Sequence, residues 1–193
     1  MNELENDIVT VSKLQVALSS SAPSVQSELS QLTLEADTAT TQGLKKLLED
    51  AVVTLLRNTE SWTHVFGSSE TISNREAAET VFNRLSIEER SKFSAETLTN
   101  VDGKIRQREL IKPEKNDDGA AYIVVTLLVG TADDRPLFAS IDTSEEMQEI
   151  LKQVAAMQLD YLMVFELLWS PQVDTDTLTE AELAAEYGGL VAI

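Results

Sequence analysis

His64 is the only histidine in the chain, so metal sites built from several histidines are excluded. A single histidine allows one Ser-His-Asp arrangement, with Ser68 or Ser69 as the nearby hydroxyl. However, the sequence contains no Gly-x-Ser-x-Gly nucleophile motif, and adjacent residues of a strand face opposite sides. We therefore interpret His64 as a strand histidine in or beside the core.

Glu166 is a carboxylate inside an otherwise apolar stretch, where an ionised group must be neutralised, paired or placed at a cleft. A raised pKa at such a position would suit acid-base chemistry. The alternative is a structural bond to Arg84, Arg90 or a backbone group, or a face that reaches solvent, and we favour the structural interpretation. An enzyme or a small-ligand binder with a cleft near Glu166 and His64 is the alternative function.

Acidic residues between Asp174 and Glu182 superficially resemble a calcium-binding loop. Such a loop needs glycine at its sixth position, but Leu178 and Thr179 occupy the fifth and sixth positions here. The chain has no cysteine, which excludes disulfides and thiolate metal sites, and its seven glycines form no phosphate-binding loop. We predict neither a metal nor a cofactor.

Acidic residues outnumber basic ones by 33 to 15, and the net charge is −18. This charge repels phosphate backbones and anionic membrane surfaces, so we predict no nucleic-acid binding. Positive charge gathers in one segment, here called the basic segment, which contains Lys104, Arg106, Arg108 and Lys112. Because charge contrast orients partners, we predict that the basic segment contacts a protein partner.

Hydrophobic patterning predicts a flexible tail at residues 1–8 and a single α+β domain at residues 9–193. The acidic, polar N-terminus is unlike a secretory signal, and the longest apolar runs fall far short of the roughly 20 residues that cross a bilayer as a helix. We expect no direct membrane insertion by this chain, while a membrane anchor outside it is compatible with these observations.

The elements that must position the candidate residues are four strands and the helices between them. Tyr122–Val129 and Leu162–Trp169 are nearly continuous apolar runs and predict strands covered on both faces. Leu14–Leu18 and Trp62–Phe66 alternate and predict strands with one buried face, the latter ended by Gly67-Ser68-Ser69. We expect a sheet of roughly four strands packed against helices, in the order β-α-α-β-α-α-β-α-β-α.

Helix starts are indicated by a hydroxyl residue followed three positions later by glutamate, the capping-box pattern. Four such pairs predict two helices between residues 74 and 99, a third helix after residue 143 and a short final one. The four pairs are Ser73 with Glu76, Ser86 with Glu89, Thr143 with Glu146, and Thr179 with Glu182.

Several stretches together resemble a known family, and their order and spacing are more specific than any one of them. They are Val11–Leu18, Phe82–Phe93, Tyr122–Val129 and Glu166–Gln172 followed by Thr177–Thr179. The chain resembles the domain-of-unknown-function family 1517 of cyanobacteria and plastids, from about Val9 to about Tyr187.

The resemblance implies a domain from an oxygenic photosynthetic organism that faces the cytoplasm or the plastid stroma. In relatives, the domain is often preceded by a Gly-rich region and a hydrophobic segment. The family brings no established catalytic residues to carry over. We therefore expect a non-enzymatic protein-interaction or regulatory domain.

Overall fold

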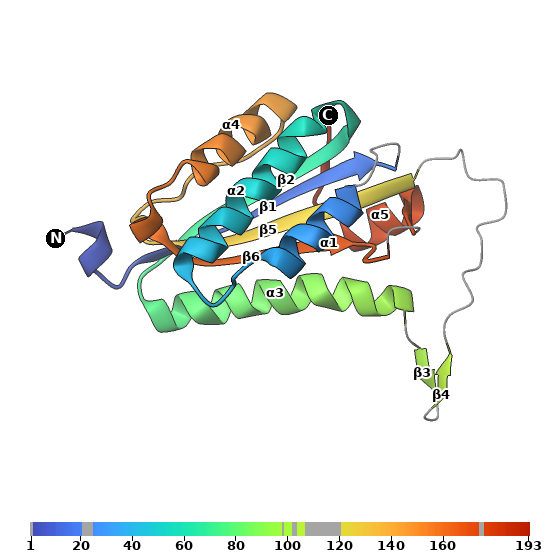
Figure 1. Cartoon of the computed structure of the whole chain (residues 1–193), viewed down its shortest axis with the longest axis horizontal. Helices are drawn as coiled ribbons and strands as arrows, with labels where there is room; N and C mark the ends of the chain where they lie inside the picture. The colour runs from blue at the N-terminus through green and yellow to red at the C-terminus, as the bar shows by residue number, and fades with distance from the viewer. Residues whose placement is uncertain (1, 21–24, 98, 102–103, 107–120, 174–175) are drawn as a thin grey trace.

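The computed structural model describes residues 2–20, 25–97, 99–101, 104–106, 121–173 and 176–193. The fold is α+β, with an antiparallel sheet whose long strands run between helices (Figure 1). The long strands are β1 (Val9–Ser19), β2 (Trp62–Ile72), β5 (Ala121–Thr131) and β6 (Leu162–Ser170). The described part of the chain has five α-helices: α1 (Val25–Glu35), α2 (Thr41–Arg57), α3 (Arg75–Thr97), α4 (Ser144–Ala155) and α5 (Glu180–Glu186).

The sheet has six strands rather than the roughly four that we predicted. Its order is β6-β5-β1-β2-β8, and β7 (Leu178–Thr179) pairs with β5. Both β7 and β8 (Val191–Ala192) have only two residues, which is too short to display an alternating pattern in sequence. A separate hairpin joins β3 (Thr99–Val101) to β4 (Lys104–Arg106).

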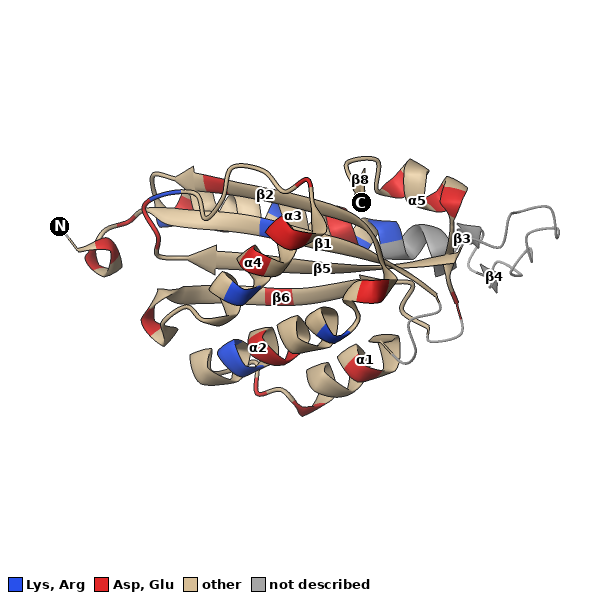
Figure 2. Cartoon of the chain, turned by 90° about the horizontal axis from the view of Figure 1, so that it is seen from above, with Lys and Arg blue, Asp and Glu red and all other residues tan. Residues whose placement is uncertain are grey.

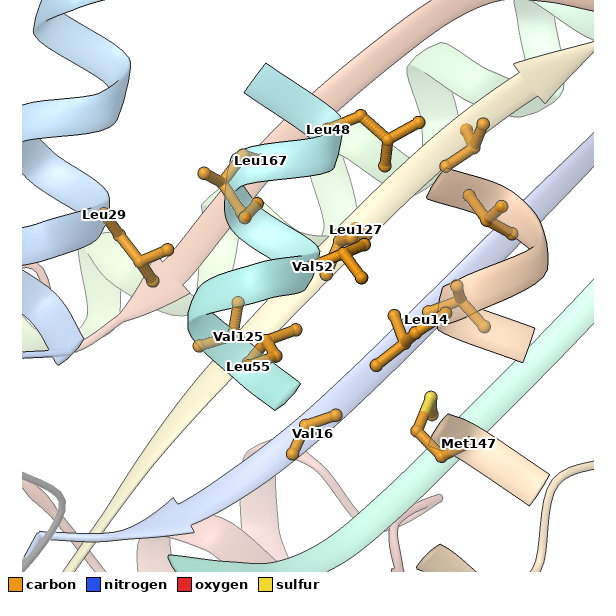
Figure 3. Packing of buried hydrophobic residues seen from close by; sticks show 14 of the residues in the cluster. Leu14, Val16, Leu29, Leu48, Val52, Leu55, Val125, Leu127, Met147 and Leu167 are labelled. Carbon is orange, nitrogen blue, oxygen red and sulfur yellow. The ribbon is translucent and has the colours of Figure 1, made fainter. Parts of the chain in front are cut away.

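The strand β1 lies centrally, and nearly all of its residues are buried because both faces of the sheet are covered. Leu14, Val16 and Leu18 belong to the larger hydrophobic core together with residues of α1, α2 and α4. Figure 3 shows Leu14 and Val16 within this core. The alternate residues Val9 and Val11 point toward α3. In Figure 1 the strands accordingly run between α4 on one side and α3 on the other.

The helix α2 buries one apolar stripe against the sheet. Leu48, Val52 and Leu55 recur at helical spacing and are at most 2% exposed (Figure 3). A fully buried leucine contributes roughly 1.5–3 kcal/mol relative to an exposed one, so this stripe stabilises the fold strongly. The helix starts at Thr40, whose hydroxyl accepts a hydrogen bond from the Gly43 backbone at 3.0 Å.

Two of the four predicted capping boxes are confirmed. Thr143 with Glu146 caps α4, and Thr179 with Glu182 caps α5. In both, the threonine hydroxyl accepts from the backbone of the glutamate, and the glutamate carboxylate accepts from the backbone of the threonine.

The prediction of two helices between residues 74 and 99 is wrong, because α3 is one helix. Ser86 and Glu89 lie inside it, where the backbone donors that a capping box would satisfy already have helical partners. At the start of α3, Asn74 rather than Ser73 accepts the hydrogen bond from the Ala77 backbone, at 2.8 Å.

The predicted end of β2 at Gly67-Ser68-Ser69 is also wrong, since the strand continues to Ile72. Gly67 is needed there for space: a Cβ atom at this position would lie 2.4 Å from Cδ1 of Ile141. Ser69 is held within the strand by a 2.9 Å hydrogen bond between its hydroxyl and that of Ser12. Gly67 therefore accommodates a packed neighbour and does not mark a turn.

Residues 2–8, which we predicted as a flexible tail, include the 3-10 helix η1 (Glu3–Glu5). The Asn6 side chain donates to both carboxylate oxygens of Asp134, at 2.8 and 2.9 Å. The division of the chain into a tail and one domain remains a prediction. None of the helices in the described ranges has the length and apolar composition needed to span a bilayer.

We expect Gly67→Ala to lower the free energy of unfolding by about 1–3 kcal/mol, because the new methyl group overlaps Ile141 and Phe138. Urea denaturation measures the change. Gly188→Ala is the control, because its Cβ would meet only the Ala184 carbonyl oxygen, at 3.3 Å. Equal stability of the two variants would contradict the close packing at Gly67.

Candidate functional site

A polar layer separates two hydrophobic clusters on the face of the sheet that α3 and α5 cover. Along this face of β1, Val9 and Val11 belong to one cluster and Ala17 to the other. Lys13 and Gln15 lie between them. Burial of a charged residue in the centre of a sheet is costly unless it is paired, so this layer is the candidate functional site.

Glu89 of α3 is the partner of Lys13. Its side chain is 1% exposed, and its Oε1 atom lies 3.2 Å from Nζ of Lys13 and 3.0 Å from Nζ of Lys92. The two lysine side chains are 14% and 19% exposed. The second carboxylate oxygen, Oε2, has no hydrogen-bond partner among the described residues. We call Lys13, Glu89 and Lys92 the buried triad.

Aromatic rings and polar groups complete the surroundings of the buried triad. Nζ of Lys13 lies 4.9 Å from the ring centre of Phe66, and Nζ of Lys92 lies 4.3 Å from that of Tyr187. Both distances are within the range of cation-π attraction. The neighbouring Gln15 donates a hydrogen bond to the Thr126 hydroxyl at 3.0 Å.

The structure pairs Glu166 with Arg90, one of the partners predicted from the sequence. Nε of Arg90 donates to Oε1 of Glu166 at 2.8 Å, and Nη2 donates to the same oxygen. The Glu166 side chain is 18% exposed and that of Arg90 is 62% exposed, so the pair lies at the border of the polar layer. Arg84 instead lies near Glu88, at 3.9 Å.

His64 lies on β2, opposite Ala17, and is half-buried. Its Nδ1 atom is 2.9 Å from the Thr63 hydroxyl, and its ring packs edge-on against Tyr122 with the centres 5.7 Å apart. Burial lowers the pKa of His64 below its ordinary value, and the negative charge of Glu180 opposes this effect.

His64 and Glu166 share a face of the sheet, but the structure does not bring them together. The order β2-β1-β5-β6 separates their strands by three steps, or about 14 Å across the sheet. Their registers also differ, because Glu166 aligns through Leu128 with Lys13, whereas His64 aligns with Ala17. This adds about 13 Å along the strands. One small substrate cannot contact both groups.

The basic segment is described only in part. The backbone of Lys104 and Arg106 lies in β4, which pairs with β3. Arg108 and Lys112 lie outside the described residues. Within the described ranges, no group of three or more histidine, aspartate or glutamate side chains is placed to hold a metal ion.

The buried triad was not predicted from the sequence. Glu89 is predicted as part of a capping box, and Lys13 precedes the strand predicted at Leu14–Leu18. The available signal was the spacing of Glu89 and Lys92, three residues apart on a helix. Lys13 also interrupts the alternate positions of β1, whose outer members Val9, Val11 and Ala17 are apolar.

The family model described as "Protein of unknown function (DUF1517)" matches residues 8–193. The chain belongs to this family. The resemblance that the sequence stretches indicated is thereby confirmed. No solved structure matches the chain.

The DUF1517 chain is similar to two curated proteins of photosynthetic organisms. It is 37% identical over 187 residues to "Protein FLAP1 homolog A" of Synechocystis, which covers 93% of this chain and 55% of the relative. It is 34% identical over 178 residues to "FLUCTUATING-LIGHT-ACCLIMATION protein 1, chloroplastic" of Arabidopsis thaliana, which covers 92% of this chain and 45% of the relative. The chain thus spans about half the length of the curated relatives it matches.

We expect Glu89→Gln to reduce the free energy of unfolding by about 3 kcal/mol, because it leaves two partly buried ammonium groups without a counter-charge. Urea denaturation measures the loss. Glu88→Gln is the matched control: this neighbour is 56% exposed, and its loss should stay within about 0.5 kcal/mol.

A Lys13→Met background separates the charge effect from a local one. In that background, Glu89→Gln should reduce the free energy of unfolding by clearly less, because only one ammonium group remains beside position 89. The same cost in both backgrounds would refute an electrostatic coupling between Lys13 and Glu89.

We expect His64 to titrate below 6.5 in an NMR experiment, since burial disfavours the charged ring. The unfolded chain then binds the proton more tightly than the folded chain. Stability is therefore unaffected well above 6.5 and falls as the pH drops below this value. His64→Gln should lose less stability than the wild type between about pH 7 and about pH 5. A measured pKa at or above 6.5 would exclude this mechanism.

Proposed function

We propose that this DUF1517 domain is a non-enzymatic interaction or regulatory domain that acts in light acclimation of a photosynthetic organism. The observation that carries the proposal is its similarity, over more than nine-tenths of its length, to relatives named for this process. We place its action in the cyanobacterial cytoplasm or on the stromal side of a plastid membrane.

The pairing of the interior charges with opposite charges supports a role without catalysis. Glu89 is shared by two lysines, and Glu166 is paired with Arg90. A general acid or base must instead reach a substrate within about 3 Å and exchange its proton. The candidate groups His64 and Glu166 lie too far apart to act on one small substrate together.

The charge distribution supports a protein as the partner. Acidic residues are spread over helices on both faces of the sheet (Figure 2), in agreement with the net charge of −18. The basic segment is the exception in sequence, with four basic residues between positions 104 and 112. An acidic partner surface would be attracted to the basic segment and repelled elsewhere, which fixes its orientation.

A chimeric protein tests the role in light acclimation. In Synechocystis, this domain would replace the matching region of FLAP1 homolog A, so that the remainder of that protein is retained. We expect a deletion strain to grow poorly under alternating strong and weak light and the chimera to restore its growth. Growth no better than that of the deletion strain, at equal protein level, would contradict the proposal.

Charge reversals in the same chimera test the contact surface. Arg106→Glu with Arg108→Glu should reduce growth under alternating light, whereas Arg84→Glu with Lys152→Glu should not. Both pairs change the net charge by the same amount, and the Arg84 and Lys152 side chains are exposed on α3 and α4. Equal growth of the two strains would remove the basic segment from the proposal.

A further inference from the structure

A cavity of about 440 Å³ lies at the C-terminal end of α4. It is formed between the last turns of α4, the turn after β5 and the 3-10 helix η3 (Leu159–Tyr161) that leads into β6. Its size is within the usual range of small-molecule sites. The buried triad lies under α3, on the other face of the sheet, so this cavity is a separate feature.

One wall of the cavity is apolar. Side chains of α4, the preceding loop and the following turn form it: Leu137, Ile150, Val154 and Met157. These residues also border the larger hydrophobic core, so the wall is held in place by packing. Such a surface favours the hydrocarbon part of a ligand.

Acidic residues lie in and beside the cavity. Asp133 lines it and is half-buried, and its carboxylate has neither a hydrogen bond nor an ion pair within the described part of the chain. Tyr161 also lines it, and its hydroxyl donates to the Glu3 carboxylate at 2.7 Å. The N-terminal turn η1 thereby brings a second carboxylate close to the cavity, at the same end of the molecule (Figure 1).

Two further observations indicate negative potential at this site. The pKa of Tyr161 is raised by its hydrogen bond to Glu3, by burial and by the charges of Glu3, Asp133 and Asp134. The C-terminus of α4 also ends here, and its carbonyl groups carry partial negative charge. Lys45 approaches the Ala155 carbonyl at 2.6 Å, but its positive charge is already paired with Glu49.

We propose that this cavity binds an organic ammonium ion with an apolar body, such as an alkylamine. The ammonium group would pair with Asp133 and lie against the Tyr161 ring, because both attract positive charge. The hydrocarbon part would cover Ile150, Val154 and Met157. An anion would meet Asp133 and Glu3. A bare metal ion would find one free carboxylate and an apolar wall, and it needs several oxygen ligands. The inference is independent of the proposed role in light acclimation.

The test compares three probes of equal chain length that differ in charge: hexylammonium, 1-hexanol and hexanoate. Each is titrated into the full chain, and binding is followed by backbone amide NMR shifts. We expect hexylammonium to shift the amides of Gln153, Met157 and Tyr161, to bind about tenfold more tightly than 1-hexanol and to weaken as salt is added. We expect no saturable shift with hexanoate.

Two variants locate the interaction. Asp133→Asn should weaken hexylammonium binding about tenfold, whereas Asp160→Asn, an exposed carboxylate in η3, should change it by less than about twofold. Ala156→Trp, at the exposed rim, should block the cavity and abolish binding of both hexylammonium and 1-hexanol. The NMR spectra report at the same time whether each variant is folded.

Several results would overturn the proposal. They are equal affinity for hexylammonium and 1-hexanol, salt-independent binding by the wild type, or shifts centred away from α4 and η3. Unchanged affinity in folded Asp133→Asn would do the same. If that variant did not fold, the comparison of probes and the salt dependence of the wild type would still decide the question.

Discussion

Lys13 places an ammonium group within the central strand of a sheet that is covered on both faces, and the arrangement of α3 depends on how this charge is paired. A buried ion without a partner costs several kcal/mol. Glu89 of α3 pairs with Lys13. It also pairs with Lys92, which lies three residues further along the same helix. The pairing sets the register of α3 on the sheet, since a rotation of the helix would remove Glu89 from Lys13. The hydrophobic clusters on either side of the polar layer then pack around this fixed point.

The two faces of the sheet have different characters. The face toward α1, α2 and α4 is an aliphatic core, whose stability comes from burial of apolar surface. The face toward α3 and α5 combines smaller apolar clusters with the buried triad and the pair of Glu166 and Arg90. Specific pairing of charges limits the positions at which the helices can pack on this face. Apolar contacts are non-directional and do not impose this limit by themselves. We regard the polar face as the part of the domain that specifies its geometry.

The capping-box pattern shows where local reasoning succeeds and where it fails. At Thr143 and Thr179 the pattern forms as predicted, because every group involved lies within four residues along the chain. At Ser86 the same pattern lies within a continuous helix, and Glu89 is bound by Lys13, which is 76 residues away. The strands β5 and β6 were also predicted from a short stretch of sequence, because a strand buried on both faces is a continuous apolar run. The two-residue strands β7 and β8 exist only through pairing with β5 and β2.

By itself, the sequence determined the α+β class, the four long strands, most helices, the acidic charge and the family resemblance, since these depend on composition and on short-range periodicity. Only the tertiary structure decided the sheet order, and with it the separation of His64 from Glu166. It also decided the choice of Arg90 over Arg84 as the partner of Glu166 and the meeting of Asp133 with the end of α4. The physical reason is that pairing between distant strands and helices depends on how their side chains pack in three dimensions, and periodicity along one segment does not record it.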